Sequence, residues 1–293
     1  MHRSGFVNII GNPNVGKSTL MNALVGEKLS IITSKAQTTR HRIMGIVSGE
    51  DFQIVYSDTP GILKPSYKLQ ESMMKFVTGA LTDADVILYV TDTVEQSERS
   101  AEIVDSIRRS GIPTVVVINK IDLSTPEALD ALVDKWRQEL PEAQIVPASA
   151  KENFNIEGLF KTILALLPEG PAFYPKETLT DKTLRFFASE IIREKILKFY
   201  DKEIPYCCEI EIDSYREEPT IDRIAATIYV ARDSQKGILI GHKGEKLKRV
   251  GQTAREDMEE FLGKKVFLQL FVKVSDDWRN NERQLRRFGY ELE

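Results

Sequence analysis

A short glycine-rich segment near the start of the chain limits most strongly what it can fold into. Residues 11–18 read Gly-Asn-Pro-Asn-Val-Gly-Lys-Ser and match the pattern G-x-x-x-x-G-K-[ST]. An apolar run at residues 6–10 predicts a buried strand before it, and residues 19–24 predict the start of a helix after it. In that setting the glycines let backbone N–H groups close around phosphate oxygens at a helix N-terminus. The segment therefore predicts a phosphate-binding loop rather than a plain strand-to-helix turn.

The end of this motif predicts how a nucleoside triphosphate and its metal ion are held. The Lys17 amine would reach the β- and γ-phosphates, and the Ser18 hydroxyl would hold Mg²⁺. We expect the whole loop and the residue after it to contact the nucleotide, which gives Gly11, Asn12, Pro13, Asn14, Val15, Gly16, Lys17, Ser18 and Thr19.

The remainder of the first half alternates apolar strand patterns with amphipathic helices. Further strands are predicted at residues 42–48, 52–57, 86–90, 114–118 and 144–147. Two of them, at 86–90 and 114–118, are continuous apolar runs, which is typical of strands buried on both faces. The pattern predicts an α/β domain with a mostly parallel sheet and helices on both faces, and such sheets bind ligands beyond the carboxyl ends of their strands.

The strand at residues 52–57 ends on Asp58-Thr59-Pro60-Gly61. An acid at the tip of a strand next to a phosphate loop can hold the Mg²⁺ shell, so Asp58 is a predicted metal ligand. The backbone N–H of Gly61 would reach the γ-phosphate. We expect nucleotide contacts from Asp58, Thr59, Pro60, Gly61 and Ile62.

Two further strand tips predict the base that is bound. Residues 119–122 read Asn-Lys-Ile-Asp, and the Asp122 carboxylate can accept both N1–H and the 2-amino group of guanine, a donor pair that adenine lacks. An ATP site is therefore disfavoured, although Asp122 or Ser124 could instead be a plain helix N-cap. The tip at 149–151 could offer N–H groups to guanine O6. The expected base contacts are Asn119, Lys120, Ile121, Asp122, Ser149, Ala150 and Lys151.

The second half predicts a smaller α+β domain. Its predicted order is helix, strand, strand, helix, helix, strand, with an I-G-x-x-G segment at residues 240–244 between two helices. Glycines permit close approach to a phosphodiester backbone, and the neighbouring cations would neutralise it. The predicted RNA contacts are Ile240, Gly241, His242, Lys243, Gly244, Lys246, Lys248 and Arg249. The basic tail could pack on this domain or contact RNA, and both remain open here.

These motifs together resemble a known family. In order and spacing, residues 11–18, 37–39, 58–61, 119–122 and 149–151 resemble the five G motifs of Ras-like GTPases, and residues 240–244 resemble the GXXG loop of a type II KH domain, which clamps about four nucleotides. Both halves in sequence resemble the Era family of bacterial GTPases. The expected limits are 1–168 for the G domain, 169–181 for a linker, 182–275 for the KH domain and 276–293 for the tail.

The resemblance implies a GTP-hydrolysing switch with GTP or GDP and Mg²⁺ as ligands. It implies that Thr39, rather than Thr38, contacts Mg²⁺ when the γ-phosphate is present, which gives Ser18, Thr39 and Asp58 as metal ligands. Ras carries a water-orienting glutamine where this chain has Ile62, so slow unaided hydrolysis is expected. The resemblance to the Era-like branch implies that Asn14 helps hold K⁺. That ion would neutralise negative charge in the transition state. The residues expected to act in hydrolysis are Lys17, Thr39, Gly61 and Asn14.

The resemblance also implies partners and a location. It points to the 3′ end of 16S rRNA, small (30S) ribosomal subunit assembly, a monomeric chain, and a cytoplasmic protein with peripheral attachment to the inner face of the cell membrane. The alternative is an RNA-binding assembly factor whose nucleotide site is structural and turns over negligibly. The composition, 42% hydrophobic and 29% charged residues, is that of an ordinary globular chain, and no stretch approaches the roughly 18 apolar residues of a membrane span.

Overall fold

The computed structural model describes residues 2–94 and 101–290, and the chain divides into two compact units. The first contains residues 1–65 and 73–181, and the second contains residues 66–72 and 182–293. Residues 95–100 of the expected G domain and 291–293 of the expected tail lie outside the described residues.

The first unit is built on a six-stranded sheet of order β2-β3-β1-β4-β5-β6, in which only the β2–β3 pair is antiparallel. Its strands are β1 (Arg3–Ile10), β2 (Ile43–Ser48), β3 (Phe52–Asp58), β4 (Val86–Asp92), β5 (Thr114–Asn119) and β6 (Gln144–Pro147). Its helices are α1 (Lys17–Val25), α2 (Lys68–Thr82), α3 (Ala101–Ser110), α4 (Pro126–Glu139) and α5 (Ile156–Leu166), with a 3₁₀ turn η1 (Ile121–Leu123). The predicted mostly parallel α/β sheet is confirmed.

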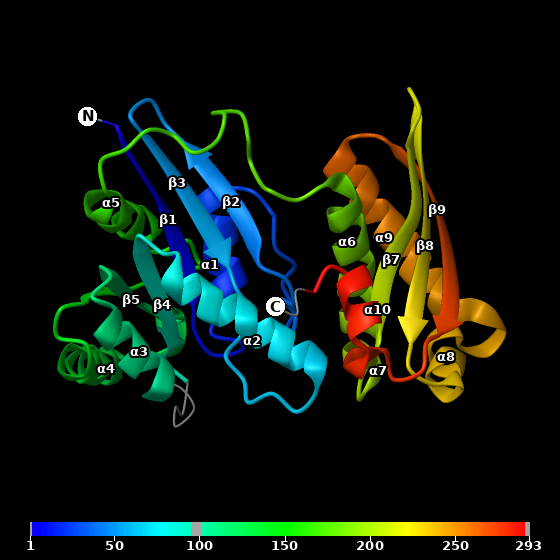
Figure 1. Cartoon of the computed structure of the whole chain (residues 1–293), viewed down its shortest axis with the longest axis horizontal. Coiled ribbons are helices and arrows are strands. Elements are labelled where there is room, and N and C mark those ends of the chain that lie inside the picture. Colours follow the sequence, from blue (N-terminus) through cyan, green and yellow to red (C-terminus); the bar gives the residue numbers. More distant parts are fainter. Residues whose placement is uncertain (1, 95–100, 291–293) are drawn as a thin grey trace. The chain divides into compact units, whose positions relative to one another are not determined.

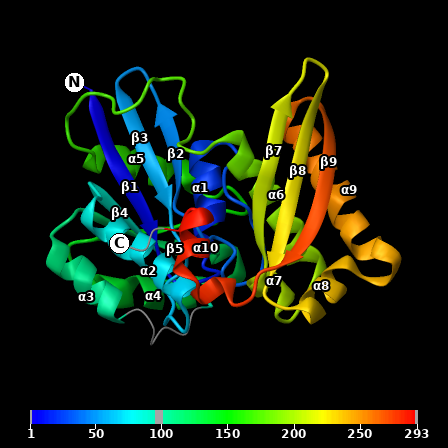
Figure 2. The same ribbon diagram turned by 45° about the vertical axis from the view of Figure 1, so that its right-hand side comes forward.

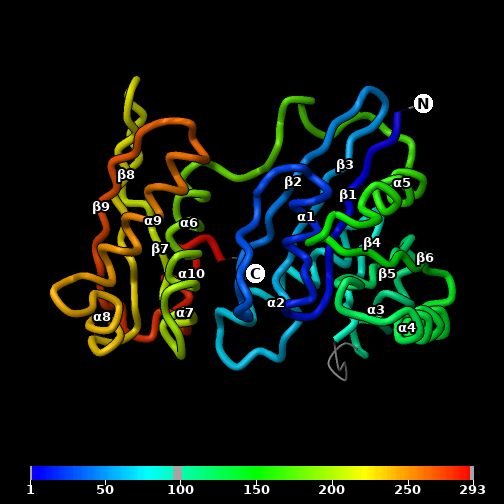
Figure 3. Tube along the Cα trace, turned by 180° about the vertical axis from the view of Figure 1, so that it is seen from behind, coloured from blue at the N-terminus to red at the C-terminus, as the bar shows by residue number. Residues whose placement is uncertain are grey.

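Both faces of this sheet are covered, because its central strands are apolar on both sides. Every residue of β4 and β5 is buried. One face packs against Val77 of α2, Ile107 of α3 and Trp136 of α4, and the Trp136 ring lies 5.3 Å from that of Tyr89. Helices α1 and α5 lie on the opposite face from α2, as Figures 1 and 3 show. The core therefore fixes the strands whose carboxyl ends carry the predicted motifs.

Residues 169–181, predicted as a linker, are attached along the first unit. Thr180 pairs with Gly45 of β2 in an isolated bridge, and the Ile46 N–H donates to the carbonyl of Leu179 at 2.8 Å. The Gln53 side-chain oxygen accepts the backbone N–H groups of Phe173 and Tyr174 at 2.7 and 2.9 Å. Strand β2 lies at the edge of the sheet, so this segment protects an edge that would otherwise be open to pairing.

The second unit is a three-stranded sheet with helices on one face. The order is β7-β8-β9, with β7 and β8 antiparallel and β8 and β9 parallel. Its main elements are α6 (Leu184–Phe199), β7 (Glu209–Glu217), β8 (Ile221–Val230), α8 (Asp233–Ile240), α9 (Glu245–Leu262) and β9 (Lys265–Val274). Helices α6, α8 and α9 share one apolar core with the sheet, and Figure 2 shows α6 behind the strands. The predicted element order is confirmed.

The sequence pattern of residues 206–212 predicts one continuous strand, and this prediction is wrong at its start. Residues 206–208 form the end of a short helix, α7 (Ile204–Cys207), and the loop after it, and the strand begins at Glu209. The apolar pattern of Tyr206 and the two cysteines favours a strand, but Pro205 supplies a fixed φ that suits the first turn of a helix. The thiols of Cys207 and Cys208 are buried and form no disulfide with a described residue, and they pack as small hydrophobic side chains.

The tail after β9 packs on the second unit. It contains η3 (Trp278–Asn280) and α10 (Glu282–Arg287). The Trp278 side chain is fully buried, and its indole N–H donates to the carbonyl of Cys207 at 2.9 Å. The Tyr290 hydroxyl donates to the Glu209 carboxylate at 2.8 Å. Of the two readings left open for the tail, the structure supports packing.

We expect Trp278→Ala to destabilise the second unit by about 3–5 kcal/mol, because it leaves a large cavity and removes the hydrogen bond to the Cys207 carbonyl. The measurement is urea unfolding of the full chain followed by circular dichroism. The exposed Phe261, replaced by alanine, gives the matched control, since its ring is only partly covered. A loss below about 1 kcal/mol for Trp278→Ala would show that the tail does not support the fold.

Candidate functional site

The predicted phosphate loop joins β1 to α1 and has a backbone that its glycines require. Gly11 and Gly16 have φ angles of 157° and 94°. A Cβ at position 11 would clash with the carbonyl oxygen of Val90, and one at position 16 would clash with the Asn119 side-chain amide. The loop therefore lies directly against the ends of β4 and β5.

The Lys17 amine lies in the mouth of this loop. It donates to the carbonyl oxygens of Gly11 and Asn12, both at 2.9 Å, and the side chain is buried. These carbonyls hold the charge at the place where a phosphate oxygen would meet it. The arrangement matches what anion binding needs, a cation and free backbone donors at the positive end of a helix.

Three oxygen-bearing side chains meet beside the loop. The Ser18 hydroxyl donates to Asp58 Oδ2 at 2.7 Å and lies 2.9 Å from the Thr39 hydroxyl, which is itself 3.4 Å from Asp58 Oδ2. Two hydroxyls and a carboxylate are hard oxygen ligands, so these residues fit Mg²⁺. Thr38 instead hydrogen bonds to Thr33 and to the carbonyl of Lys35, which favours Thr39 as the ligand.

Burial governs the electrostatics of this cluster. The Asp58 side chain is fully buried, and burial raises its pKa, while the Ser18 hydroxyl and the Lys17 charge act in the opposite direction. Its Oδ1 makes no hydrogen bond to any described residue. A divalent cation would offset the cost of burying this carboxylate.

The segment after Asp58 approaches the phosphate loop closely. A Cβ on Gly61 would come within 2.8–2.9 Å of the Pro13 backbone, so this position requires glycine. The Ile62 N–H donates to the carbonyl of Gly11 at 3.2 Å, and its side chain is buried in the core with Ile10 and Val77. Ile62 therefore has neither the polarity nor the position to orient a water molecule.

Asn119 joins all three loops. Its side-chain amide donates to the carbonyl of Val15 at 2.8 Å and accepts the N–H of Ala150 at 3.0 Å. Lys120, with φ of 59°, donates to the carbonyl of Asn14 and to the Asp92 carboxylate, both at 2.6 Å. The sequence reasoning missed Asp92, which lies at the tip of β4, the one parallel strand end without a recognised motif.

The predicted base contacts gather at the ends of β5 and β6. Asp122 Oδ1 accepts the Ser149 hydroxyl at 2.6 Å, while Lys151 is largely exposed. Thr125, and not Asp122 or Ser124, caps helix α4, since its side chain accepts the N–H of Ala128. The capping alternative for Asp122 and Ser124 is therefore wrong, and the Asp122 carboxylate remains available to a ligand.

A pocket of about 380 Å³ lies over the phosphate loop. Its lining includes Lys17, Ser18, Thr39, Gly61 and Lys120. Residues 31–35, not predicted, form part of its wall, while Asp122 and Ser149 lie outside its lining. The polar character of the loop after α1 was the only signal that could have indicated those wall residues.

The second unit carries the predicted GXXG segment between α8 and α9. Gly241 and Gly244 have φ angles of 73° and 79°, and Lys243 between them has φ of 47°. His242 and Lys243 are exposed. Among the described residues no group of three or more His, Cys, Asp or Glu side chains could hold a metal ion, so His242 is a loop residue.

A groove of about 540 Å³ runs beside this segment. It is lined by Gly244, Leu247, Lys248, Gly251, Gln252, Arg255, Leu268 and Leu270. Gly244 and Lys248 were predicted, but Ile240 is not part of the lining. The remaining lining residues lie on one face of α9 and at alternate positions of β9. This periodicity could have identified them from the sequence. Arg249 and Lys246 lie over the rings of Phe199 and Tyr200 at 4.2 and 5.8 Å.

No helix in the described part of the chain is both long and apolar enough to cross a membrane.

Known proteins resemble both units. Residues 6–120 match the family model described as 50S ribosome-binding GTPase, and residues 203–279 match the KH domain. The GTPase Era of Staphylococcus haemolyticus is 45% identical over 99% of this chain and 97% of its own length. That of Alkaliphilus metalliredigens is also 45% identical, over 99% of both chains.

Two solved structures share the whole fold, each with a TM-score of 0.95 and 41% identity. One is Era in complex with MgGDPNP and nucleotides 1506–1542 of 16S ribosomal RNA, and covers 100% of both chains. The other is a variant of Aquifex aeolicus Era bound to GDP and AlF4⁻, covering 99% of this chain and 100% of that one. With such identity over nearly its full length, and with both domain types in the same order, the chain belongs to the Era family of GTPases.

Proposed function

We propose that the first unit binds GTP with Mg²⁺ and hydrolyses it slowly. The observation that carries this is the convergence of the ends of β3 and β5 on the loop that follows β1. Ser18 of the phosphate loop contacts Asp58 at the end of β3, and Asn119 at the end of β5 bonds the same loop through Val15. A single nucleotide can therefore be held at its phosphates and at its base by side chains that are already positioned.

Each residue has a separate part in the proposed hydrolysis. The Lys17 amine exchanges its two carbonyl partners for β- and γ-phosphate oxygens, and the Gly61 N–H donates to the γ-phosphate. Ser18, Thr39 and Asp58 would hold Mg²⁺, whose charge offsets that of the phosphates when it is bound. Ile62 leaves the attacking water without a side-chain partner, so unaided turnover is slow.

We expect GTP turnover to be about tenfold or more faster in potassium than in sodium buffer, because a cation at Asn14 would neutralise charge that develops between the phosphates. Asn14 fits this part, since it lines the pocket with φ of 65° and an exposed side chain. The measurement is steady-state phosphate release at equal ionic strength. Asn14→Ala should remove the difference, and equal rates of the unaltered chain in both salts would contradict the role.

The second unit is proposed to bind single-stranded RNA in the groove beside the GXXG segment. The exposed Lys243 and Lys248 lie next to a groove with an apolar floor at Leu268 and Leu270, which suits bases on one side and phosphates on the other. The Era structure solved with nucleotides 1506–1542 of 16S rRNA supports the 3′ end of that RNA as the ligand. We also propose that the protein acts in 30S subunit assembly, in the cytoplasm or at the inner face of the cell membrane.

The two activities are proposed to be coupled as in a switch. GTP with Mg²⁺ would order the loops at Thr39 and Gly61, and hydrolysis would release them and change the RNA affinity of the second unit. Multiple-turnover hydrolysis with and without a 16S 3′-end oligomer tests this, with Lys17→Ala as the inactive control. The expected result is turnover of the unaltered chain that changes when RNA is added.

One observation favours a second candidate, an RNA-binding assembly factor whose nucleotide site is structural. Ile62 is buried away from the phosphates, so the described residues include no water-orienting side chain at this position. Negligible turnover under every salt and RNA condition, together with tight retention of nucleotide, would support this candidate instead.

A further inference from the structure

Strand β9 presents different chemistry on its two faces. Leu268 and Leu270 point toward the helices and line the groove. The alternate residues lie on the opposite face, where the Phe267 and Phe271 side chains are 43% and 50% exposed. Exposed apolar side chains that gather on one face can mark an interaction site, so this face is a candidate contact surface. We call it the outer strip, made of Lys265, Phe267, Gln269, Phe271 and Lys273 with the neighbouring Arg216 and Arg223.

The pairing register places arginines beside the first phenylalanine. Arg216 of β7 lies opposite Arg223 of β8, which lies opposite Phe267 of β9. The Arg223 guanidinium lies 5.4 Å from the centre of the Phe267 ring. A guanidinium beside an exposed ring offers both a stacking surface and a phosphate partner.

The charge of the strip is positive along β9. Residues 265–274 contain two lysines and no acid. Lys273 makes no ion pair with any described residue, while Lys265 and Arg223 each pair with one exposed or partly exposed glutamate. The Glu211 carboxylate on β7 is already neutralised by Arg287. The strip therefore complements a polyanion.

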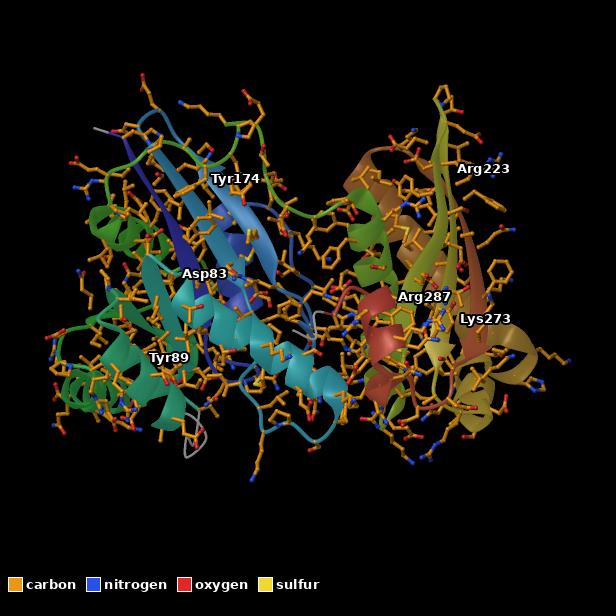
Figure 4. All side chains as sticks on the ribbon, viewed as in Figure 1. Asp83, Tyr89, Tyr174, Arg223, Lys273 and Arg287 are labelled. Atoms are coloured by element: carbon orange, nitrogen blue, oxygen red, sulfur yellow. The ribbon has the colours of Figure 1, made fainter. Side chains whose placement is uncertain are left out.

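The tail covers another part of the outer face. Phe288 packs against Tyr229 with ring centres 5.3 Å apart, and Arg287 lies over the same tyrosine. These contacts cover the outer face on the side of β7 and the end of β8. Arg223 and Lys273, labelled in Figure 4 with Arg287, mark the two ends of the surface that remains.

The spacing of the two rings suits an extended strand. Phe271 lies four positions after Phe267 along the strand, which places the two residues about 13 Å apart. That distance is several times the roughly 3.4 Å between stacked bases in a duplex. Bases splayed apart on a single strand, with Gln269 between them as a hydrogen-bonding group, match this spacing.

We propose that the outer strip binds single-stranded RNA that leaves the groove and continues around the free edge of β9. The strand is the last in its sheet, so nothing in the sheet pairs with that edge, and the same strand forms both surfaces. The stacked arginine and the unpaired lysine favour RNA over an apolar protein partner. The inference rests on the proposed RNA-binding function and extends it to a second surface.

The test uses the full chain and two lengths of RNA. The long probe is a fluorescent single strand of about 12 nucleotides from the 3′ end of 16S rRNA, and the short probe is the tightest-binding tetramer within it, since a GXXG groove holds about four nucleotides. Phe267→Ala/Phe271→Ala should weaken binding of the long probe about tenfold or more and change the tetramer by less than about twofold.

Three further variants make each outcome decisive. Phe267→Trp/Phe271→Trp should retain binding of the long probe, because the larger rings still stack. Phe154→Ala, at a still more exposed phenylalanine of the first unit, should change neither probe. Gly244→Asp should weaken both probes, since it blocks the groove.

The measurements distinguish an error in the outer-strip proposal from an error in the proposed RNA-binding groove. If the double alanine variant binds the long probe as the unaltered chain does, the strip does not bind RNA and is left to a protein partner. If that variant weakens both probes equally, the strip acts only through the fold and the proposal is also wrong. If the unaltered chain binds neither probe, the proposed RNA-binding function itself is contradicted.

Discussion

Replacing Lys17 by alanine is expected to lower GTP turnover by about a hundred- to thousandfold, the loss seen when one preorganised donor to a developing charge is removed. The amine is buried, and the carbonyls of Gly11 and Asn12 hold it within 2.9 Å in the mouth of the loop. Residues 11–18 contain no other cation, so the loop itself offers no replacement. The measurement is steady-state phosphate release at saturating GTP and Mg²⁺.

The fold should survive this substitution, which keeps the result interpretable. The Lys17 amine donates to the carbonyls of Gly11 and Asn12, which both belong to the phosphate loop, and alanine favours the first turn of α1. Lys28→Ala, at an exposed position just after the same helix, is the matched control and should turn over normally. Turnover within about threefold of the unaltered chain would mean that the phosphates lie elsewhere.

Replacing Asp122 by asparagine should weaken GTP binding by about a thousandfold and create a preference for xanthosine nucleotides. One of the two carboxylate oxygens becomes an amide N–H donor that faces the 2-amino group, and the bond to N1–H loses its charged acceptor; bonds to charged groups contribute about 1.5–3 kcal/mol each. Xanthine carries a carbonyl where guanine carries the amino group, so the new amide N–H would donate to it. Competition against a fluorescent nucleotide measures both affinities.

The control for this change is Asp130→Asn, an exposed acid on α4 away from the strand ends. It should leave the nucleotide preference unchanged. Ser149 should remain in place in the Asp122 variant, because an asparagine oxygen can still accept its hydroxyl. A variant that keeps its preference for GTP would show that Asp122 does not read the base.

Local motifs predicted the nucleotide site well because each lies at the end of a predictable strand. Strands β4 and β5 are continuous apolar runs, so their tips could be placed from the sequence. Asp92 was missed although it ends β4, because its ion pair with Lys120 depends on the register between neighbouring strands. That register follows from packing and not from any local pattern.

In the second unit, too, local patterns could be predicted from the sequence and tertiary packing could not. Its element order could be predicted from hydrophobic periodicity, but the groove could not, because Leu268 and Leu270 meet α9 only in the folded sheet. Helix α6 also contains a buried ion pair, in which Arg193 bonds both carboxylate oxygens of Glu190 at 2.5–2.7 Å. Charged residues are rarely fully buried, so composition favours an exposed face for them.

The most direct test of the central claim is an experimental structure of this chain with Mg²⁺ and a non-hydrolysable GTP analogue. The account predicts one nucleotide, with its γ-phosphate at Lys17, its metal at Ser18, and its guanine on Asp122. A nucleotide that contacts only one of these three groups, or that binds outside the loop at residues 11–18, would contradict it.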